Sequence, residues 1–131
     1  MKVIILTLML MLGLVVSAWA QAADTLTVKA GKQEAAPRSK LKIKFVEVTE
    51  DSRCPMGATC IWAGNAKVRV EVRNRGGGSK TFEVNTTMGP KGERFDGWAI
   101  DLVSLTPVPR ADGKLDSQVY VAKFKITRLQ R

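Results

Sequence analysis

Alternation of apolar and polar side chains with a period of two recurs along residues 21–131, and it most constrains how the chain folds. The clearest case is residues 66–73, where valines alternate with charged side chains. A strand points successive side chains to opposite faces, so this pattern predicts a half-buried strand. No long segment of residues 21–131 shows the 3.6-residue period of an amphipathic helix. The sequence therefore predicts an all-β domain.

Further strands are predicted by the same pattern at residues 25–29, 40–49, 81–86, 98–105 and 118–129. The alternation changes phase after Phe45 and after Leu102, which indicates a β-bulge or a strand that passes between sheets. Residues 66–86 are expected to form a hairpin with a cationic, glycine-rich tip. Residues 88–97 contain Gly89-Pro90 and two further glycines, and we expect them to be irregular.

Six or seven such strands favour a two-layer antiparallel β-sandwich, for which an immunoglobulin-like topology is one option. A small β-barrel would satisfy the same pattern. The sequence does not choose between these topologies.

The N-terminus has the three regions of a cleavable signal peptide. Lys2 precedes an apolar run from Val3 to Val16, and Ser17-Ala18-Trp19-Ala20 follows, with small residues at the positions that the A-x-A cleavage rule requires. The run is shorter than the ~20 residues that a membrane-spanning helix needs. We expect cleavage after Ala20 or Ala22, leaving one exported domain over residues 21–131, periplasmic or secreted, with no transmembrane segment.

The two cysteines, Cys54 and Cys60, are expected to form a disulfide bond because export brings them into an oxidising compartment. A ring spanning residues 54–60 stabilises a fold by roughly 2 kcal/mol, so the bond serves mainly to rigidify a loop. Their spacing differs from the Cys-x-x-Cys of thiol oxidoreductases. Binding of Cu(I) by these cysteines with Met56 and Met88 would require reduced thiols. We expect no metal and no cofactor.

The segment around the cysteines reads Asp51-Ser52-Arg53-Cys54-Pro55 and then Cys60-Ile61-Trp62-Ala63-Gly64. It resembles the motif D-S-R-C-P, a few residues, then C-x-W-A-G, of small exported bacterial proteins of uncharacterised function. The resemblance implies a secreted β domain with this disulfide bond and no established activity.

Read from its side chains, the same segment predicts a structural corner. Trp62 offers a large apolar surface that we expect to pack over the disulfide bond or to cap one end of the sandwich. Arg53 is expected to tie the loop down through Glu50 and Asp51 by charge-assisted hydrogen bonds. Gly64 allows the chain to turn into the next strand.

The chain contains no histidine, which excludes a Ser-His-Asp triad and ordinary Zn²⁺ or Cu²⁺ sites. Two carboxylate pairs are left for a hydrolase, Asp96 with Asp101 and Asp112 with Asp116. These aspartates lie near turns, where Asp is favoured for local hydrogen bonding. The sequence therefore favours a protein that is not an enzyme.

The chain carries a net charge of +9, and removal of Lys2 with the signal peptide leaves +8. Such an excess attracts anionic partners, and it also keeps a small domain soluble. Cationic side chains are expected on the outward faces of the strands, where they would form one basic face if those strands are neighbours: Lys42, Lys44, Lys67, Arg69, Arg73, Lys123 and Lys125. Lys80 is expected at the cationic hairpin tip, which would add to this face.

These observations predict a non-enzymatic binding or inhibitory module of the bacterial envelope, with an anionic envelope polymer or an acidic protein as its partner. Nucleic acid is not expected, because the chain is exported and lacks an aromatic stacking platform. The alternative is a structural or accessory domain that docks by β-strand addition at a sheet edge. A carboxylate-based hydrolase is the least favoured reading.

Overall fold

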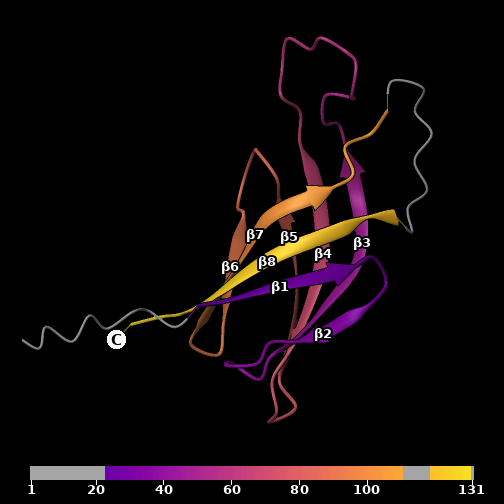
Figure 1. The fold of residues 1–131 in the computed structure, drawn as a ribbon. Coiled ribbons are helices and arrows are strands. Elements are labelled where there is room, and N and C mark those ends of the chain that lie inside the picture. Colours follow the sequence, from indigo (N-terminus) through magenta and orange to yellow (C-terminus); the bar gives the residue numbers. More distant parts are fainter. Residues whose placement is uncertain (1–22, 111–118, 131) are drawn as a thin grey trace, which may run out of the picture.

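Two antiparallel sheets of four strands each pack face to face in the computed structural model, which describes residues 23–110 and 119–130 (Figure 1). The prediction of a two-layer β-sandwich is confirmed, and the sheets do not close into a barrel. The predicted signal peptide, residues 1–20, lies outside the described residues, as do Asp112 and Asp116.

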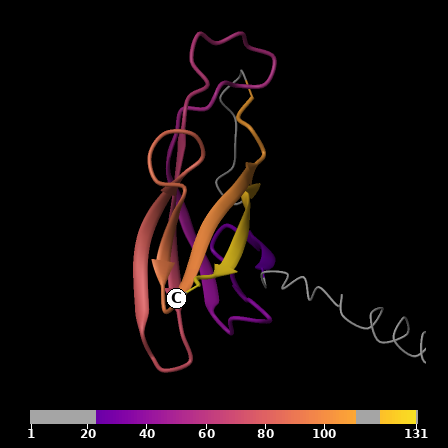
Figure 2. The same cartoon turned by 90° about the vertical axis from the view of Figure 1, so that its left-hand side faces the viewer.

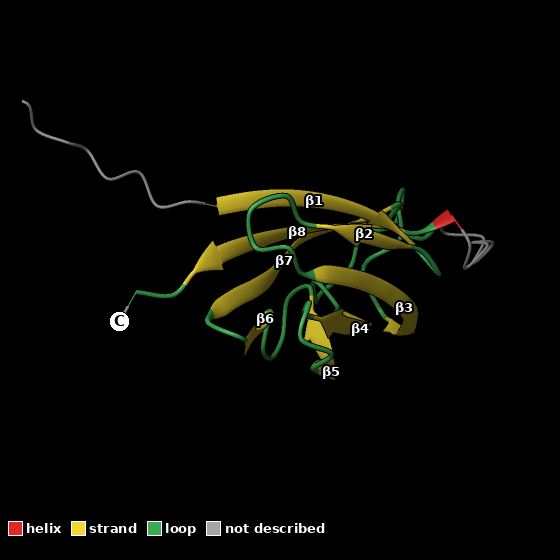
Figure 3. Cartoon of the chain, turned by 90° about the horizontal axis from the view of Figure 1, so that it is seen from below, coloured by secondary structure: helices red, strands yellow, loops and turns green. Residues whose placement is uncertain are grey.

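Sheet I contains, in spatial order, β1 (Ala23–Lys29), β8 (Val121–Arg128), β7 (Trp98–Thr106) and β6 (Gly92–Phe95). Sheet II contains β2 (Gln33–Ala35), β3 (Lys42–Asp51), β4 (Ala66–Arg73) and β5 (Ser79–Asn85). Figure 3 shows the sandwich from below, with β1 and β8 of sheet I above β4 and β5 of sheet II. β4 and β5 form the predicted hairpin, since Arg73 pairs with Ser79 and Lys67 with Asn85.

The core lies between the sheets because the longer strands turn their apolar positions inward. In β4 the three valines are fully buried, whereas the charged positions between them are partly or fully exposed. Fully buried side chains come from both layers: Ile43, Phe45, Val68, Val70, Val72 and Val84 from sheet II, and Val28, Ile100, Ala122, Phe124 and Ile126 from sheet I.

Both predicted changes of phase are β-bulges. The register of β3 against β4 shifts between Phe45 and Glu47 and again after Val48, and that of β7 against β8 shifts between Leu102 and Ser104. The first shift brings Val48 opposite the buried Val68. A bulge inserts one extra residue, so the apolar side chains after it return to the core face.

The described residues form eight strands rather than six or seven, because the sequence pattern did not reveal β2 and β6. The prediction that residues 88–97 are irregular is wrong for β6. Gly92 does not break this strand: a Cβ atom there would lie 2.1 Å from Oδ1 of Asp101 and 2.5 Å from the carbonyl oxygen of Ile100. The missing side chain lets β6 approach β7 closely.

The connections of β4 lie at opposite ends of the sandwich (Figures 1 and 2). Residues 52–65, called here the disulfide loop, join β3 to β4 at one end. Residues 74–78, called here the hairpin tip, join β4 to β5 at the other end. The edge strands of the two sheets approach each other, β5 against β6 and β1 against β2. No helix in the described ranges is long and apolar enough to cross a membrane.

Candidate functional site

The predicted basic residues are divided among different surfaces. Lys42, Lys44, Lys67, Arg69 and Arg73 share the outer face of sheet II, where they alternate with buried positions of β3 and β4. Lys123 and Lys125 belong to the exposed positions of β8, on the outer face of sheet I. Lys80 lies on β5 opposite the buried Val72, and its Nζ lies 3.4 Å from Oε1 of Glu93 on β6. The structure does not bring all eight together.

Glutamates interleave with the cations on the outer face of sheet II. Arg69 forms ion pairs with Glu47 at 2.5 Å and Glu83 at 3.4 Å, and Lys67 with Glu50 at 3.4 Å. Exposed pairs of this kind add little stability, but they cancel the positive field of the groups involved. The middle of this face is therefore close to neutral. The sequence could not reveal this pairing, because it depends on the register between strands.

Positive charge accumulates instead in a hollow beside the hairpin tip, called here the tip hollow. It has a volume of about 470 Å³ and is lined by Gln33, Lys40, Lys42, Arg73, Asn74 and Arg75. None of these lining residues is acidic. Among the described residues only Arg73 of its four cations forms an ion pair, with Glu71. The hollow therefore keeps an excess of positive charge.

Two cations of the tip hollow face each other across neighbouring strands. Lys42 of β3 and Arg73 of β4 are direct partners in the register. Like charges in such a pair destabilise a sheet. Lys40 adds a third cation from a residue with φ of 62°, in the left-handed region that non-glycine residues seldom adopt. The like-charge pair and the backbone conformation of Lys40 therefore both destabilise this corner of the sheet.

The backbone of the hairpin tip is held by Asn74. Its amide donates to the carbonyl oxygen of Gly78 at 2.9 Å, and its Oδ1 accepts from the amide of Gly78 at 2.8 Å. Its Nδ2 also donates to Oδ2 of Asp96 at 3.3 Å. These bonds close the turn that contains Arg75, so the backbone that carries this cation is fixed by hydrogen bonds.

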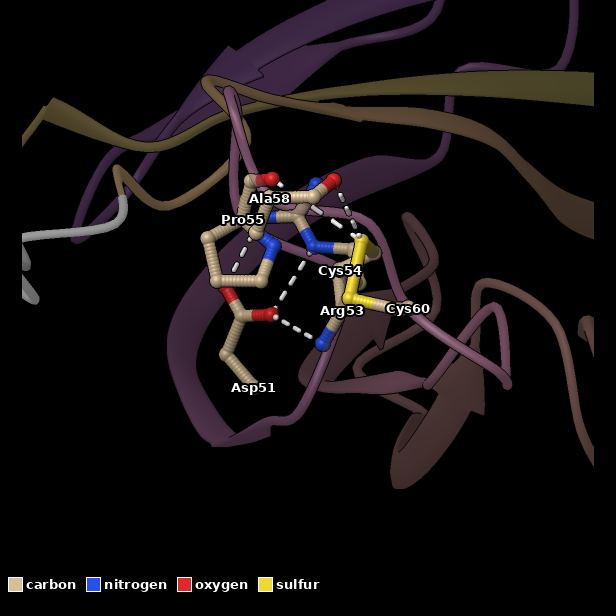
Figure 4. The surroundings of a disulfide bond; sticks show 6 residues. All are labelled: Asp51, Arg53, Cys54, Pro55, Ala58 and Cys60. Atoms are coloured by element: carbon tan, nitrogen blue, oxygen red, sulfur yellow. Dashed lines mark hydrogen bonds and ion pairs between the residues drawn. A yellow bond between two sulfur atoms is a disulfide. The ribbon is translucent and has the colours of Figure 1, made fainter.

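At the opposite end, Cys54 and Cys60 form the predicted disulfide bond, with 5.8 Å between their Cα atoms. Figure 4 shows the Arg53 guanidinium against the Asp51 carboxylate beside this bond. Nε of Arg53 donates to Oδ1 of Asp51 at 2.9 Å, and Nη2 donates to Oδ2 at 2.7 Å. The two side chains are only 10% and 9% exposed. Glu50, the other predicted partner, pairs with Lys67 instead.

Arg53 also connects the two sheets. Its Nη1 donates to the carbonyl oxygen of Leu105 at 2.5 Å, and its Nη2 to that of Pro107 at 2.8 Å, both at the end of β7. Because Asp51 ends β3 in sheet II, the guanidinium bridges the layers. We call Asp51, Arg53 and Tyr120, whose hydroxyl donates to Oδ2 of Asp51 at 2.7 Å, the Arg53 clamp.

Ionisation of the clamp is shifted in both of its acidic groups. Burial raises the pKa of Asp51, but the hydrogen bonds from Arg53 and Tyr120 outweigh it, so the pKa lies below its ordinary value. Burial and the Asp51 carboxylate raise the pKa of Tyr120 to about 12. The clamp thus holds a carboxylate and a neutral phenol at neutral pH.

The disulfide loop re-enters the sheet through Gly64 and Asn65. Gly64 has φ of 69°, and a Cβ atom there would lie 1.9 Å from the carbonyl oxygen of Ser52. The Ser52 amide donates to the Asn65 carbonyl at 2.7 Å. The buried Asn65 side chain accepts from the amides of Thr87 and Met88. Only glycine fits this crossing, which confirms the turn predicted for Gly64.

Three large apolar side chains of the disulfide loop point to solvent. Met56 is 66% exposed, Ile61 is 93% exposed and Trp62 is 81% exposed. The prediction that Trp62 packs over the disulfide bond or caps the sandwich is therefore wrong. Hydrogen bonds from Arg53 close this end of the sandwich instead. The sequence does mark this loop as unusual, since residues 54–65 contain no charged side chain although 25% of the chain is charged.

The described aspartates of the hydrolase hypothesis are exposed and belong to different structural positions. Asp96 lies in the turn between β6 and β7, and Asp101 on the outer face of β7. Asp101 lines a second hollow of about 360 Å³ together with Glu93 and Arg94. The pKa of Glu93 is lowered, chiefly by a hydrogen bond from the Arg94 amide, whereas a general acid needs a raised pKa.

Among the residues with described positions, no group of three or more Cys, Asp or Glu side chains is arranged to hold a metal ion. The disulfide bond also occupies both thiols that Cu(I) binding would need. Comparison of the chain with protein-family models, curated proteins and solved structures finds no match.

Proposed function

We propose that this protein is a non-enzymatic binding module of the bacterial envelope that holds an anionic polymer in its tip hollow. The observation that carries the proposal is the direct pairing of Lys42 with Arg73 in a hollow that Lys40 and Arg75 also line. Neighbouring cations repel one another, and an anion between them turns the repulsion into attraction. Local violations of folding rules tend to mark functional sites.

Chemistry of the lining side chains favours phosphate or carboxylate groups. Arginine presents a planar fork that binds either group through two hydrogen bonds, and lysine adds a point charge. The amides of Gln33 and Asn74, which also line the hollow, offer further donors. The hollow is open enough for a repeating anionic chain to pass across it, whereas a hydrolytic site would require converging catalytic groups.

An envelope location is supported by the disulfide bond, which fits an oxidising compartment, and by the predicted signal peptide. The anion is expected at one end of sheet II and not over its whole outer face, because glutamates neutralise the centre of that face. Docking by strand addition stays a prediction that no described contact favours.

The test is calorimetric titration of the mature protein with linear polyphosphate at low and at high salt. We expect binding at low salt that weakens steeply as salt rises, because counterion release and screening both act on phosphate contacts. The double charge-reversal variant Lys42→Glu with Arg75→Glu should weaken binding at least about tenfold, since it removes two lining cations.

The matched control is Lys123→Glu with Lys125→Glu, which changes the net charge equally on the other sheet. We expect it to weaken binding no more than about twofold, through long-range attraction alone. Equal losses of affinity in the two variants would show that only the net charge matters and would contradict a site in the tip hollow. Absence of binding at low salt would rule out the proposal. Tighter binding of polyglutamate than of polyphosphate would replace the polymer by an acidic protein.

A further inference from the structure

The disulfide loop combines exposed apolar side chains with a backbone that is held in place. Trp62 and Ile61 directly follow Cys60, and Met56 lies inside the ring that the disulfide bond closes. The backbone is braced by bonds from the Cys54 amide to the Ala63 carbonyl, 3.2 Å, and from the Met56 amide to the Pro109 carbonyl, 2.8 Å. The exposure of these side chains is therefore built into the fold.

Rigidity of this kind favours binding. A loop that is ordered before it meets its partner loses less conformational entropy on association. Tryptophan offers a large contact area with few rotatable bonds and is enriched at the energetic centres of interfaces, from which most charged residues are depleted. Residues 54–65 have this composition, with Trp62 exposed and no charged side chain.

A membrane does not fit this arrangement well. Shallow insertion of a few apolar side chains is weak and needs a second attraction, commonly cations that face the same lipid surface. The cations of the tip hollow lie at the opposite end of the sandwich (Figure 1). Among the described residues, Arg110, bridged to Met56, is a cation beside the loop, and a single cation adds little to surface attraction.

A second copy of the chain is also a poor occupant. The loop protrudes from the sandwich (Figure 2), and two protrusions cannot enclose each other over the area that a stable dimer needs. The two hollows described above are lined by charged side chains, including Lys42 and Arg75 in one and Glu93 and Asp101 in the other. Neither would receive an indole ring without leaving charges unpaired.

We infer that the disulfide loop docks into an apolar, uncharged cleft of a different protein, with Trp62 as the main anchor. The surface is separate from the tip hollow, so this interaction does not depend on anion binding. A rigid protruding loop with an apolar tip complements a concave site, and its occupation of a partner's cleft would exclude other ligands from that cleft.

The experiment uses the full chain in the cells that produce it, with photoreactive benzoylphenylalanine at Ile61 or, as a control, at Val103. Val103 is also an exposed apolar residue, 56% exposed, on the bulge of β7. We expect a discrete adduct with one other protein from position 61 and none from position 103. The adduct alone is not sufficient, so the cross-linked protein is identified, purified and titrated with the mature chain.

In that titration Trp62→Ser should weaken binding about thirtyfold or more, as expected for the loss of an interface anchor, and Val103→Ser no more than about twofold. Unchanged affinity of Trp62→Ser would overturn the inference. Lipid adducts, or blue-shifted tryptophan emission with phosphatidylethanolamine and phosphatidylglycerol vesicles, would replace the protein partner by a membrane. A cross-linked or sedimenting homodimer would replace it by a second copy. Equal adducts from both positions would show that the loop has no specific partner.

Discussion

The two ends of the sandwich satisfy their polar groups in opposite ways. At the disulfide-loop end, Asp51, Arg53 and Tyr120 bond to one another and Arg53 also bonds to backbone carbonyls, while the exposed side chains of the loop are apolar. In the tip hollow, Lys42 and Arg73 face each other, and what remains outside is charge. At the first end, the bonds that stabilise the fold also hold the exposed apolar side chains in place, whereas at the second end the exposed cations contribute little to stability.

The largest expected difference in stability between the two ends follows from removal of an arginine side chain at each. Arg53→Ala should lower the free energy of unfolding by about 3–5 kcal/mol, because it leaves the nearly buried Asp51 carboxylate without its cation. Arg75→Ala at the hairpin tip should change it by no more than about 0.5 kcal/mol, as an exposed cation does. Urea unfolding of both variants measures the difference, and comparable losses would contradict it.

A second difference concerns two glycines in the left-handed region. Gly64 has φ of 69° and no room for a Cβ atom, whereas Gly77, in the hairpin tip, has φ of 86° and open space around it. Gly77→Ala should cost about 1 kcal/mol, the backbone penalty alone. Gly64→Ala should cost about 3 kcal/mol, because the Ser52 backbone must also move. Equal thermal and urea stabilities of the two variants would show that the loop adapts.

The fold could be predicted because its signals are local. Alternating valines in residues 66–73 and the phase changes after Phe45 and Leu102 follow from which face each residue occupies. β2 carries no such signal, since its three residues are all exposed. In β6, Gly92 resembled a strand breaker, although the contact that requires it, Asp101, lies on another strand.

The candidate sites were harder to predict because they depend on non-local pairing. The cationic residues were identified correctly as outward-facing in β3, β4 and β8, but their assignment to two sheets and their pairing with glutamates follow from strand order. Trp62 was expected to be buried on account of its size. Arg53 instead occupies the space between the sheet ends through Leu105 and Pro107, which are distant in sequence.

The Arg53 clamp should also make the disulfide-loop end sensitive to alkali. The phenol of Tyr120 has a pKa of about 12 in the folded protein against 10.0 ordinarily. A raised pKa gives stability that is complete below pH 10 and is lost as the pH rises toward 12. Tyr120 is the only tyrosine, so tyrosinate absorbance reports it alone.

In that titration Asp51→Asn should move the midpoint toward 10, because it removes the carboxylate that opposes ionisation of the phenol. In urea unfolding, Tyr120→Phe should lose less stability than the wild-type protein between pH 10 and pH 12. A wild-type midpoint near 10 would mean that the phenol is solvated and that the clamp does not extend to Tyr120.

The smallest expected effect is that of the disulfide bond itself. Cys54→Ala with Cys60→Ala should lower stability by roughly 2 kcal/mol, the value for so short a ring, and should leave a folded β domain. Arg53 remains to hold the loop to β7, so urea unfolding should stay cooperative. Loss of cooperative unfolding would show that the bond, and not the clamp, organises this end. If the inferred cleft exists, the same variant should bind it more weakly although Trp62 is intact, because a freed loop must be ordered on association.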